Sequence, residues 1–199
     1  MILRWKYLYA VLLALAFLWL PAAGPVHAFA PDKGMFLVAA EKLVDPRFHR
    51  GVILLIQHDA QGSAGLVINR TSSLALETIL PEDSRLIGQG VTLSYGGPVE
   101  AQTLLALVKV RNHQPEPADE VLGSIYVTGV GVLNEWPDFV TEVIAWRPFI
   151  GYTGWAPGQL DLEMQRGDWQ VLPADEESVF AAGGEQLWES LHMQLTRQK

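Results

Sequence analysis

The amino-acid sequence predicts an α+β fold with a mostly antiparallel sheet. Apolar runs of strand length, rich in β-branched residues and separated by turn residues, recur along the chain, whereas helical spacing is confined to a few segments. Strands and short helices are interspersed without a βαβ rhythm, which argues against a doubly wound parallel sheet. We therefore expect a single domain over residues 34–199, preceded by a short linker at residues 29–33.

Several apolar runs predict the strands of this sheet. Met35–Ala40 is a short apolar run, and Gly51–His58 is apolar on both faces, which is typical of a central strand. Residues 59–63 contain a glycine and predict a hairpin loop, after which Ala64–Asn69 forms the antiparallel partner. Further strands are expected at Thr92–Tyr95, Leu104–Val110, Ser124–Thr128 and Trp169–Leu172.

Helices are expected where proline or glycine delimits a run with helical spacing. Pro157–Arg166 has proline in its first turn and is followed by Gly167, a usual end signal. Glu185–Leu195 carries leucines four residues apart on one face. Leu74–Leu80 predicts two helical turns that end at Pro81.

Two further prolines bear on the middle of the chain. Pro137 lies inside the run Val132–Ala145, so a helix is expected to start or restart there. Pro148 lies in the strand expected at Arg147–Tyr152, and because proline cannot donate to a ladder, this strand is expected at a sheet edge.

Residues 1–28 carry the marks of a secretory signal. Arg4 and Lys6 form a positive lead, Tyr7–Leu20 contains no charge, and Ala28 ends a segment with small residues at the cleavage position. The apolar run is shorter than the roughly 20 residues that span a bilayer as a helix. We expect export to the periplasm or medium with cleavage near Ala28. The alternative is an uncleaved segment that anchors the chain in the inner membrane, and membrane contact is expected only through this segment.

The composition excludes several classes of function. The chain has 14 Lys and Arg against 22 Asp and Glu, a net charge of −8, and residues 1–28 contain no acid. This charge opposes binding to nucleic acid, whose phosphates are bound by Lys and Arg. The absence of cysteine excludes a cysteine nucleophile, a zinc–thiolate site and an iron–sulfur cluster. The histidines show no metal-binding spacing and no nucleotide-binding motif is complete, so we expect neither a metal nor a cofactor.

Four short motifs are distributed along the chain: Asp45-Pro46-Arg47-Phe48, Gly65-Leu66-Val67-Ile68-Asn69-Arg70, Gly96-Gly97-Pro98-Val99, and the run from Gly151 to Leu160 with Glu163 just beyond it. In this order and at about these distances they resemble the YqgE/AlgH family of bacterial proteins. The resemblance extends over nearly all of the chain after the leader, and the run from Gly151 to Leu160 is its most specific part.

The resemblance implies a fold more than a function. It implies an α+β fold in which a bent sheet closes into a pseudo-barrel with helices packed outside. The family has no established biochemical role, although some members are labelled transcriptional regulators. This sequence departs from the family in its export signal, in Thr71 where a proline commonly follows Asn-Arg, and in Val108 where a histidine often ends the strand. The first departure opposes a DNA-binding role, and the last opposes chemistry by that histidine.

The segment from Gly151 to Glu163 is the strongest candidate for a binding site. Tyr152 and Trp155 would supply a flat apolar wall with a polar edge. Gly158 would let the backbone approach a ligand at the start of a helix, whose free N–H groups attract anions. Gln159 and Glu163 are four residues apart and share a helix face. The alternative interpretation is a tight strand–turn–helix corner with two core aromatics.

Four polar residues form a second candidate group. Asp45 and Arg47 would form a charged pocket wall, or would simply cap a turn. Asn69 and Arg70 end a strand, where polar side chains often line a site, or would form a solvated strand end. No catalytic residue is assigned, because His58 and Asp59 are adjacent on a strand and point to opposite faces, and no nucleophile motif accompanies them.

These features favour an exported, non-enzymatic protein that binds an envelope protein or a small ligand through the Tyr152–Trp155 corner. Burial of both aromatics would make the corner merely structural. The alternative is a hydrolase that uses Glu163 with Arg70 or Asp45, which requires these groups to converge in one cleft. A transcriptional regulator is the third alternative and requires the chain to stay inside the cell.

Overall fold

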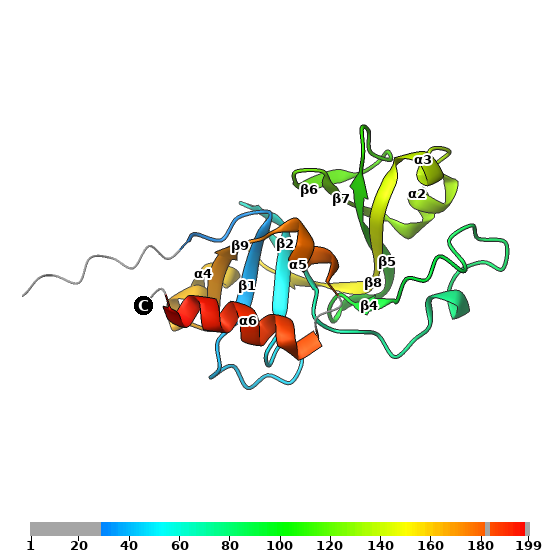
Figure 1. Cartoon of the computed structure of the whole chain (residues 1–199). Coiled ribbons are helices and arrows are strands. Elements are labelled where there is room, and N and C mark those ends of the chain that lie inside the picture. The colour runs from blue at the N-terminus through cyan, green and yellow to red at the C-terminus, as the bar shows by residue number, and fades with distance from the viewer. Residues whose placement is uncertain (1–28, 182–183, 198–199) are drawn as a thin grey trace, which may run out of the picture.

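The structure is a computed structural model that describes residues 29–181 and 184–197 (Figure 1). The predicted signal segment at residues 1–28 lies outside the described residues. Among the described residues, no helix combines the length and the apolar character that a membrane crossing requires.

A nine-stranded sheet forms the framework of the described chain. The strands follow the order β6-β7-β5-β8-β3-β2-β1-β9, and β4 pairs with β8 beside this path. The pairings given by the register are antiparallel except that of β4 with β8. The strands are β1 Met35–Ala39, β2 Val52–Asp59, β3 Gly62–Val67, β4 Ser94–Tyr95, β5 Val99–Val110, β6 Asp119–Leu122, β7 Ile125–Gly129, β8 Val143–Trp155 and β9 Trp169–Pro173.

The α+β class expected from the sequence is confirmed, although the sheet does not close into a barrel. Its path ends at β6 on one side and at β9 on the other, and no ladder joins these two strands in the described part of the chain.

Strand β8 belongs to both halves of the sheet. Its first part pairs with β5, and its last residues pair with β3. At the change of partner Gly151 has φ +66°, and a Cβ atom there would lie 2.4 Å from the carbonyl oxygen of Gly97. Only glycine fits this close crossing of two backbones. The crossing lets one continuous strand join the two lobes in Figure 1.

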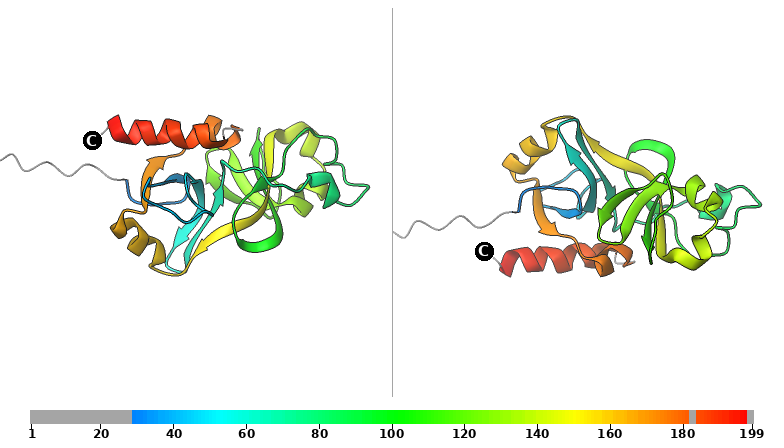
Figure 2. Two further views of the ribbon diagram at one scale, coloured as in Figure 1. Left: turned by 90° about the horizontal axis from the view of Figure 1, so that it is seen from below. Right: turned by 90° about the horizontal axis from the view of Figure 1, so that it is seen from above.

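Helices flank the sheet in both lobes (Figure 2). Helix α6 lies along the lobe that contains β1 and β9, where the indole of Trp188 donates to the carbonyl of Ala39 at 2.7 Å. The helical segments are η1 Leu76–Thr78, α2 Val130–Glu135, α3 Phe139–Glu142, α4 Gln159–Arg166, α5 Glu176–Phe180 and α6 Gly184–Arg197.

The described chain has two buried apolar clusters, the larger of which also includes Leu107, Ile125 and Phe149 of β5, β7 and β8. The larger cluster packs β1, β2, β3 and β9 against α5 and α6, around Phe36, Leu54 and Trp188. The smaller one packs β5 and the start of β8 against α2 and α3, around Leu133 and Trp146. The leucines of the expected terminal helix, Leu187, Leu191 and Leu195, all lie in the larger cluster, as their spacing indicated.

The two expectations based on proline are met only in part. A helix does restart after Pro137, since α3 begins at Phe139, but it ends at Glu142 and the chain is a strand from Val143 onward. Pro148 does not mark an edge, because β8 is internal. Pro148 faces Ala106 of β5, whereas the pairing of β8 with β4 begins only at Phe149. At Pro148 the strand therefore has a partner on one side only, and the missing N–H leaves no ladder hydrogen bond unmade on the other side.

Candidate functional site

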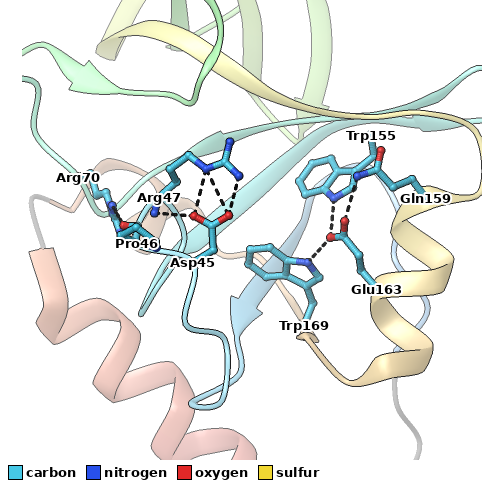
Figure 3. A network of polar contacts seen from close by, with 8 residues as sticks. All are labelled: Asp45, Pro46, Arg47, Arg70, Trp155, Gln159, Glu163 and Trp169. Atoms are coloured by element: carbon cyan, nitrogen blue, oxygen red, sulfur yellow. Dashed lines mark hydrogen bonds and ion pairs between the residues drawn. The ribbon is translucent and has the colours of Figure 1, made fainter.

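The first candidate group converges on the carboxylate of Glu163 (Figure 3). One carboxylate oxygen accepts hydrogen bonds from the indole nitrogens of Trp155 at 2.9 Å and Trp169 at 2.8 Å. The other oxygen accepts from the amide of Gln159 at 3.0 Å. Glu163 therefore ties α4 to the end of β8 and the start of β9.

The turn before α4 is built to place this carboxylate. Gly158 has φ +74° immediately before the helix, and the side-chain oxygen of Gln159 accepts from the backbone N–H of Ala156 at 3.1 Å. Trp155 is only 7% exposed and meets Trp169 edge to face at 6.2 Å between ring centroids. Trp155 is thus a core residue of the strand–turn–helix corner, and its ring is not exposed enough to contact a binding partner.

Tyr152 behaves differently from Trp155. Its ring is half-buried, and its hydroxyl donates to the carboxylate of Glu100 at 3.3 Å. Burial raises the pKa of the Tyr152 phenol, and the Glu100 carboxylate raises it further. Tyr152 and Ser63 help to line an open hollow of about 400 Å³ beside the corner.

The structure gives His58 a partner that the sequence pattern did not indicate. His58 and Ser63 face each other across the β2–β3 hairpin, with 2.8 Å between Nδ1 and the hydroxyl oxygen. Asp59 does not orient the imidazole, because its carboxylate accepts from Gln57 and from the backbone of Gln61. A hydroxyl and an imidazole are therefore paired, but the third member of a hydrolase triad is not supplied by Asp59.

The second candidate group shapes the loop between β1 and β2. Asp45 accepts from the backbone N–H of Arg47 at 2.9 Å and from its guanidinium at 2.6 Å. The hydrogen bonds from Arg47 lower the pKa of the Asp45 carboxyl. The side chain of Asp45 thus closes the turn locally, and both partners stay at the surface.

Asn69 and Arg70 hold this loop from the end of β3. The amide of Asn69 is buried: it donates to the carbonyl of Arg50 at 2.8 Å and accepts from the backbone N–H of Val52 at 2.9 Å. The guanidinium of Arg70 donates to the carbonyls of Pro46 at 3.0 Å and His49 at 2.7 Å. The strand end therefore satisfies backbone carbonyls that a loop would otherwise leave to water.

The loop and the start of α6 enclose a surface hollow of about 590 Å³, which we name the arginine hollow. Its lining residues are Val44, Pro46, His49, Arg50, Asn69, Arg70 and Glu185. Arg50 adopts φ +53°, places its guanidinium 5.1 Å from the ring centroid of Trp188, and pairs with Glu185 at 3.3 Å. The hollow thus combines fixed cationic groups with an apolar rim.

The two candidate groups are neighbours, but they do not form one cleft. Phe48 meets Trp169 edge to face at 5.9 Å and so links the loop to the corner. The arginine hollow is lined by Arg70 and not by Glu163. The convergence of Glu163 with Arg70 or Asp45 that a hydrolase would require is therefore not found there.

Two charged residues that the fold shields from solvent, Glu142 and Arg147, were not singled out from the sequence. Glu142 is buried and accepts from the backbone N–H groups of Asn112 at 2.9 Å and His113 at 3.4 Å. Arg147 is half-buried and donates to three backbone carbonyls. The role of Arg147 could have been suspected from its position between apolar residues of an expected strand, because a charge shielded from water needs hydrogen-bond partners inside the protein. Glu142 gave no such signal.

The contact between His113 and Asp138 makes stability depend on pH. A hydrogen bond from the imidazole to Asp138, 3.0 Å long, raises the pKa of His113 above its usual value. Protonated His113 therefore stabilises the fold below the ordinary histidine pKa, and this contribution is lost as the pH rises through the raised pKa. We expect NMR titration to give a raised pKa for His113 and a lower one in Asp138→Asn. An unchanged pKa in the variant would contradict the assignment.

Comparison with known proteins places this geometry in a family. The model of the AlgH-like family matches residues 36–198. A UPF0301 protein of Rhodococcus opacus is 39% identical over 78% of both chains. One of Mycobacteroides abscessus is 36% identical over 83% of this chain and 80% of that protein.

Solved structures agree with the sequence matches. A crystal structure of a Corynebacterium diphtheriae protein superposes with a TM-score of 0.72 at 27% identity, covering 84% of this chain and 88% of the other. The solution structure of the AlgH protein from Pseudomonas aeruginosa gives a TM-score of 0.69 at 28% identity, covering 84% of this chain and 91% of the other. The resemblance expected from four short motifs is confirmed, and the chain belongs to the AlgH-like family.

Proposed function

We propose that this chain is an exported, non-enzymatic binding protein of the cell envelope that takes an anionic group of its partner in the arginine hollow. The observation that carries the proposal is the hollow itself, where Arg50 and Arg70 lie beside the side chain of Val44, which is 83% exposed. An exposed apolar residue next to fixed guanidinium groups is a common composition for a protein-binding surface.

The state of the other candidate side chains supports a binding role over an enzymatic one. Glu163 is engaged by two indoles and one amide. This carboxylate is committed to holding the corner, so it is not available as the acid or base that hydrolysis needs.

An anionic partner group is favoured because the two arginines outnumber the one carboxylate in the lining. Glu185 is that carboxylate, and its side chain is 73% exposed. Ion pairs at such exposed positions contribute little, typically about 0–1 kcal/mol. Arg50 also pairs with the exposed Glu189 at 3.7 Å, so a carboxylate or phosphate on a partner displaces two exposed carboxylates from Arg50, while stacking on Trp188 keeps the guanidinium in place.

Export and binding are tested in one strain that produces the full-length chain with a C-terminal tag. Fractionation is expected to recover the tag outside the cytoplasm on a chain that begins near residue 29. Recovery of the intact chain from the cytosol would contradict export and would reopen the regulatory alternative.

Photo-crosslinking then tests the arginine hollow. A photoreactive amino acid in place of Val44 is expected to give a discrete adduct, and Arg50→Gln is expected to reduce it. Val140 on α3 is the matched control, because it is also 83% exposed but does not line the hollow. Equal adducts from both positions, or an adduct insensitive to Arg50→Gln, would count against the proposed site.

A further inference from the structure

A second surface lies in the other lobe, between the loop at residues 113–119, helix α2 and the strands β2, β5 and β7. Two hollows of about 560 and 800 Å³ adjoin there and share Gln114, Glu116 and Pro117 in their linings. We name the surface lined by these two hollows the acidic groove. None of the residues that line it belongs to the arginine hollow.

The floor and the rim of the acidic groove differ in chemistry. Ile56, Leu105 and Val127, from three different strands, supply an aliphatic floor at one end. The ring of Trp136 lines the other end. The acidic residues of the lining, Glu116, Asp119 and Glu135, are all exposed.

These three carboxylates are not neutralised from within the protein. In residues 29–181 and 184–197, none of them takes part in an ion pair or a side-chain hydrogen bond. His113, the one basic residue of the lining, already pairs with Asp138. The groove therefore presents uncompensated negative charge along an apolar floor, and a cationic occupant would be attracted to it.

The backbone next to the groove favours an extended occupant. Strand β6 ends the sheet path and pairs only with β7 among the described strands. Asp119, its first residue, lines the groove. The carbonyl of Val121 on this strand lies close to Gly34, which leaves the end at the exposed Asp119 and Glu120 for a further strand. Such a strand would form main-chain hydrogen bonds there, while alternate side chains reach a floor on one side.

We infer that the acidic groove binds an extended peptide segment of a partner protein in which cationic and apolar side chains alternate. The apolar side chains lie on the floor formed by Ile56, Leu105 and Val127, and the cationic ones meet Glu116, Asp119 and Glu135. Alternation fits because successive side chains of an extended peptide point to opposite sides. This inference is independent of the arginine hollow and survives if that proposal fails.

The probe is a fluorescent peptide of about ten residues, the length of a long strand, that alternates lysine and valine. Fluorescence anisotropy with the chain from residue 29 onward is expected to show saturable binding that weakens as salt is raised. Peptides with glutamate in place of lysine, or serine in place of valine, are expected to bind at least about tenfold more weakly, since they lose the charge or the floor contact.

A triple variant tests the site on the protein. Glu116→Gln, Asp119→Asn and Glu135→Gln together are expected to weaken binding about tenfold or more. The matched control neutralises the exposed Glu41, Glu77 and Asp161, which lie outside the groove lining and change the net charge equally. Equal weakening in both triple variants would reduce the effect to net charge and overturn the inference.

A second variant fills the groove without removing any acid. Ala118 lines it and is half-buried, and Ala118→Arg places a long cationic side chain there. We expect this variant to abolish peptide binding while its thermal melting stays close to that of the wild type. Retained binding by a folded Ala118→Arg variant, or equal binding of the serine-containing peptide, would also overturn the inference.

Discussion

Glu163→Ala is expected to lower the free energy of unfolding by about 3 kcal/mol, because it leaves two indole N–H groups without their acceptor. Both indoles donate to the same oxygen of Glu163, at 2.9 and 2.8 Å. Trp155 and Trp169 are each less than 9% exposed, so water cannot easily replace the lost acceptor.

The loss would extend beyond the two hydrogen bonds. Glu163 also accepts from Gln159, which in turn caps the backbone of Ala156 before α4. Removing the carboxylate therefore loosens the start of the helix and the edge-to-face contact of the two tryptophans. Denaturant unfolding followed by tryptophan fluorescence measures the effect as a lower midpoint with an unchanged slope.

Two variants control this measurement. Glu163→Gln keeps an oxygen acceptor but loses the charge, so we expect it to retain more than half of the stability that Glu163→Ala loses. Asp161→Ala alters an exposed carboxylate on the same helix that has no side-chain hydrogen bond within the described residues, and it is expected to change stability little. A midpoint for Glu163→Ala equal to that of Asp161→Ala would show that Glu163 does not hold the corner.

The sequence predicted most strands because their signal is local. Gly51–His58 is apolar on both faces, and β2 indeed lies between two neighbours in the sheet. The edge prediction from Pro148 failed because proline requires only that the strand lack a hydrogen-bonding partner on one side at that residue. β8 meets this requirement inside the sheet, since β4 pairs with it only from Phe149 onward, and the sequence around Pro148 does not reveal where the distant β4 ends. The length of β5, which begins at Val99, depends in the same way on its pairing with β8.

The corner between residues 151 and 163 could be predicted from the sequence, but the contacts of its residues could not. Glycines and aromatics between residues 151 and 163 indicated a tight corner, and the corner exists. The two indoles that meet Glu163 come from different strands, and Trp169 had no motif to connect it with Trp155. The partner of His58 was likewise hidden, because Ser63 faces it only in the register of the hairpin.

Arg147→Met is expected to lower the free energy of unfolding by about 2–4 kcal/mol, because it removes the donor shared by several acceptors that remain in place. The guanidinium donates to the carbonyls of Ile68 at 2.6 Å, Val179 at 3.1 Å and Ala181 at 3.3 Å. It also donates to the hydroxyl of Ser94 at 2.8 Å. Replacing an arginine by an apolar side chain is often tolerated when its partners change too, but backbone carbonyls cannot be replaced.

The position of Arg147 explains why one residue has this weight. It joins β8 to the end of β3, to β4 and to the end of α5, and it lies 5.2 Å from the ring centroid of Phe149. Arg147→Lys keeps the positive charge, but a single ammonium group cannot reach all the acceptors that the planar guanidinium contacts. We therefore expect Arg147→Lys to recover only part of the stability that Arg147→Met loses. Arg111→Met is the control, since Arg111 is exposed and its side chain has no hydrogen bond in the described part of the chain.

The pH dependence separates this effect from that of His113. Burial lowers the pKa of Arg147 to about 10, so the guanidinium is still charged at neutral pH. Because the folded-state pKa is below the ordinary value, burial opposes the charged form, and stability rises with pH only above about 10. The deficit of Arg147→Met should therefore be constant between about pH 6 and 8, where the contribution of His113 changes. A deficit that varies over this range would mean that Arg147 is coupled to a histidine.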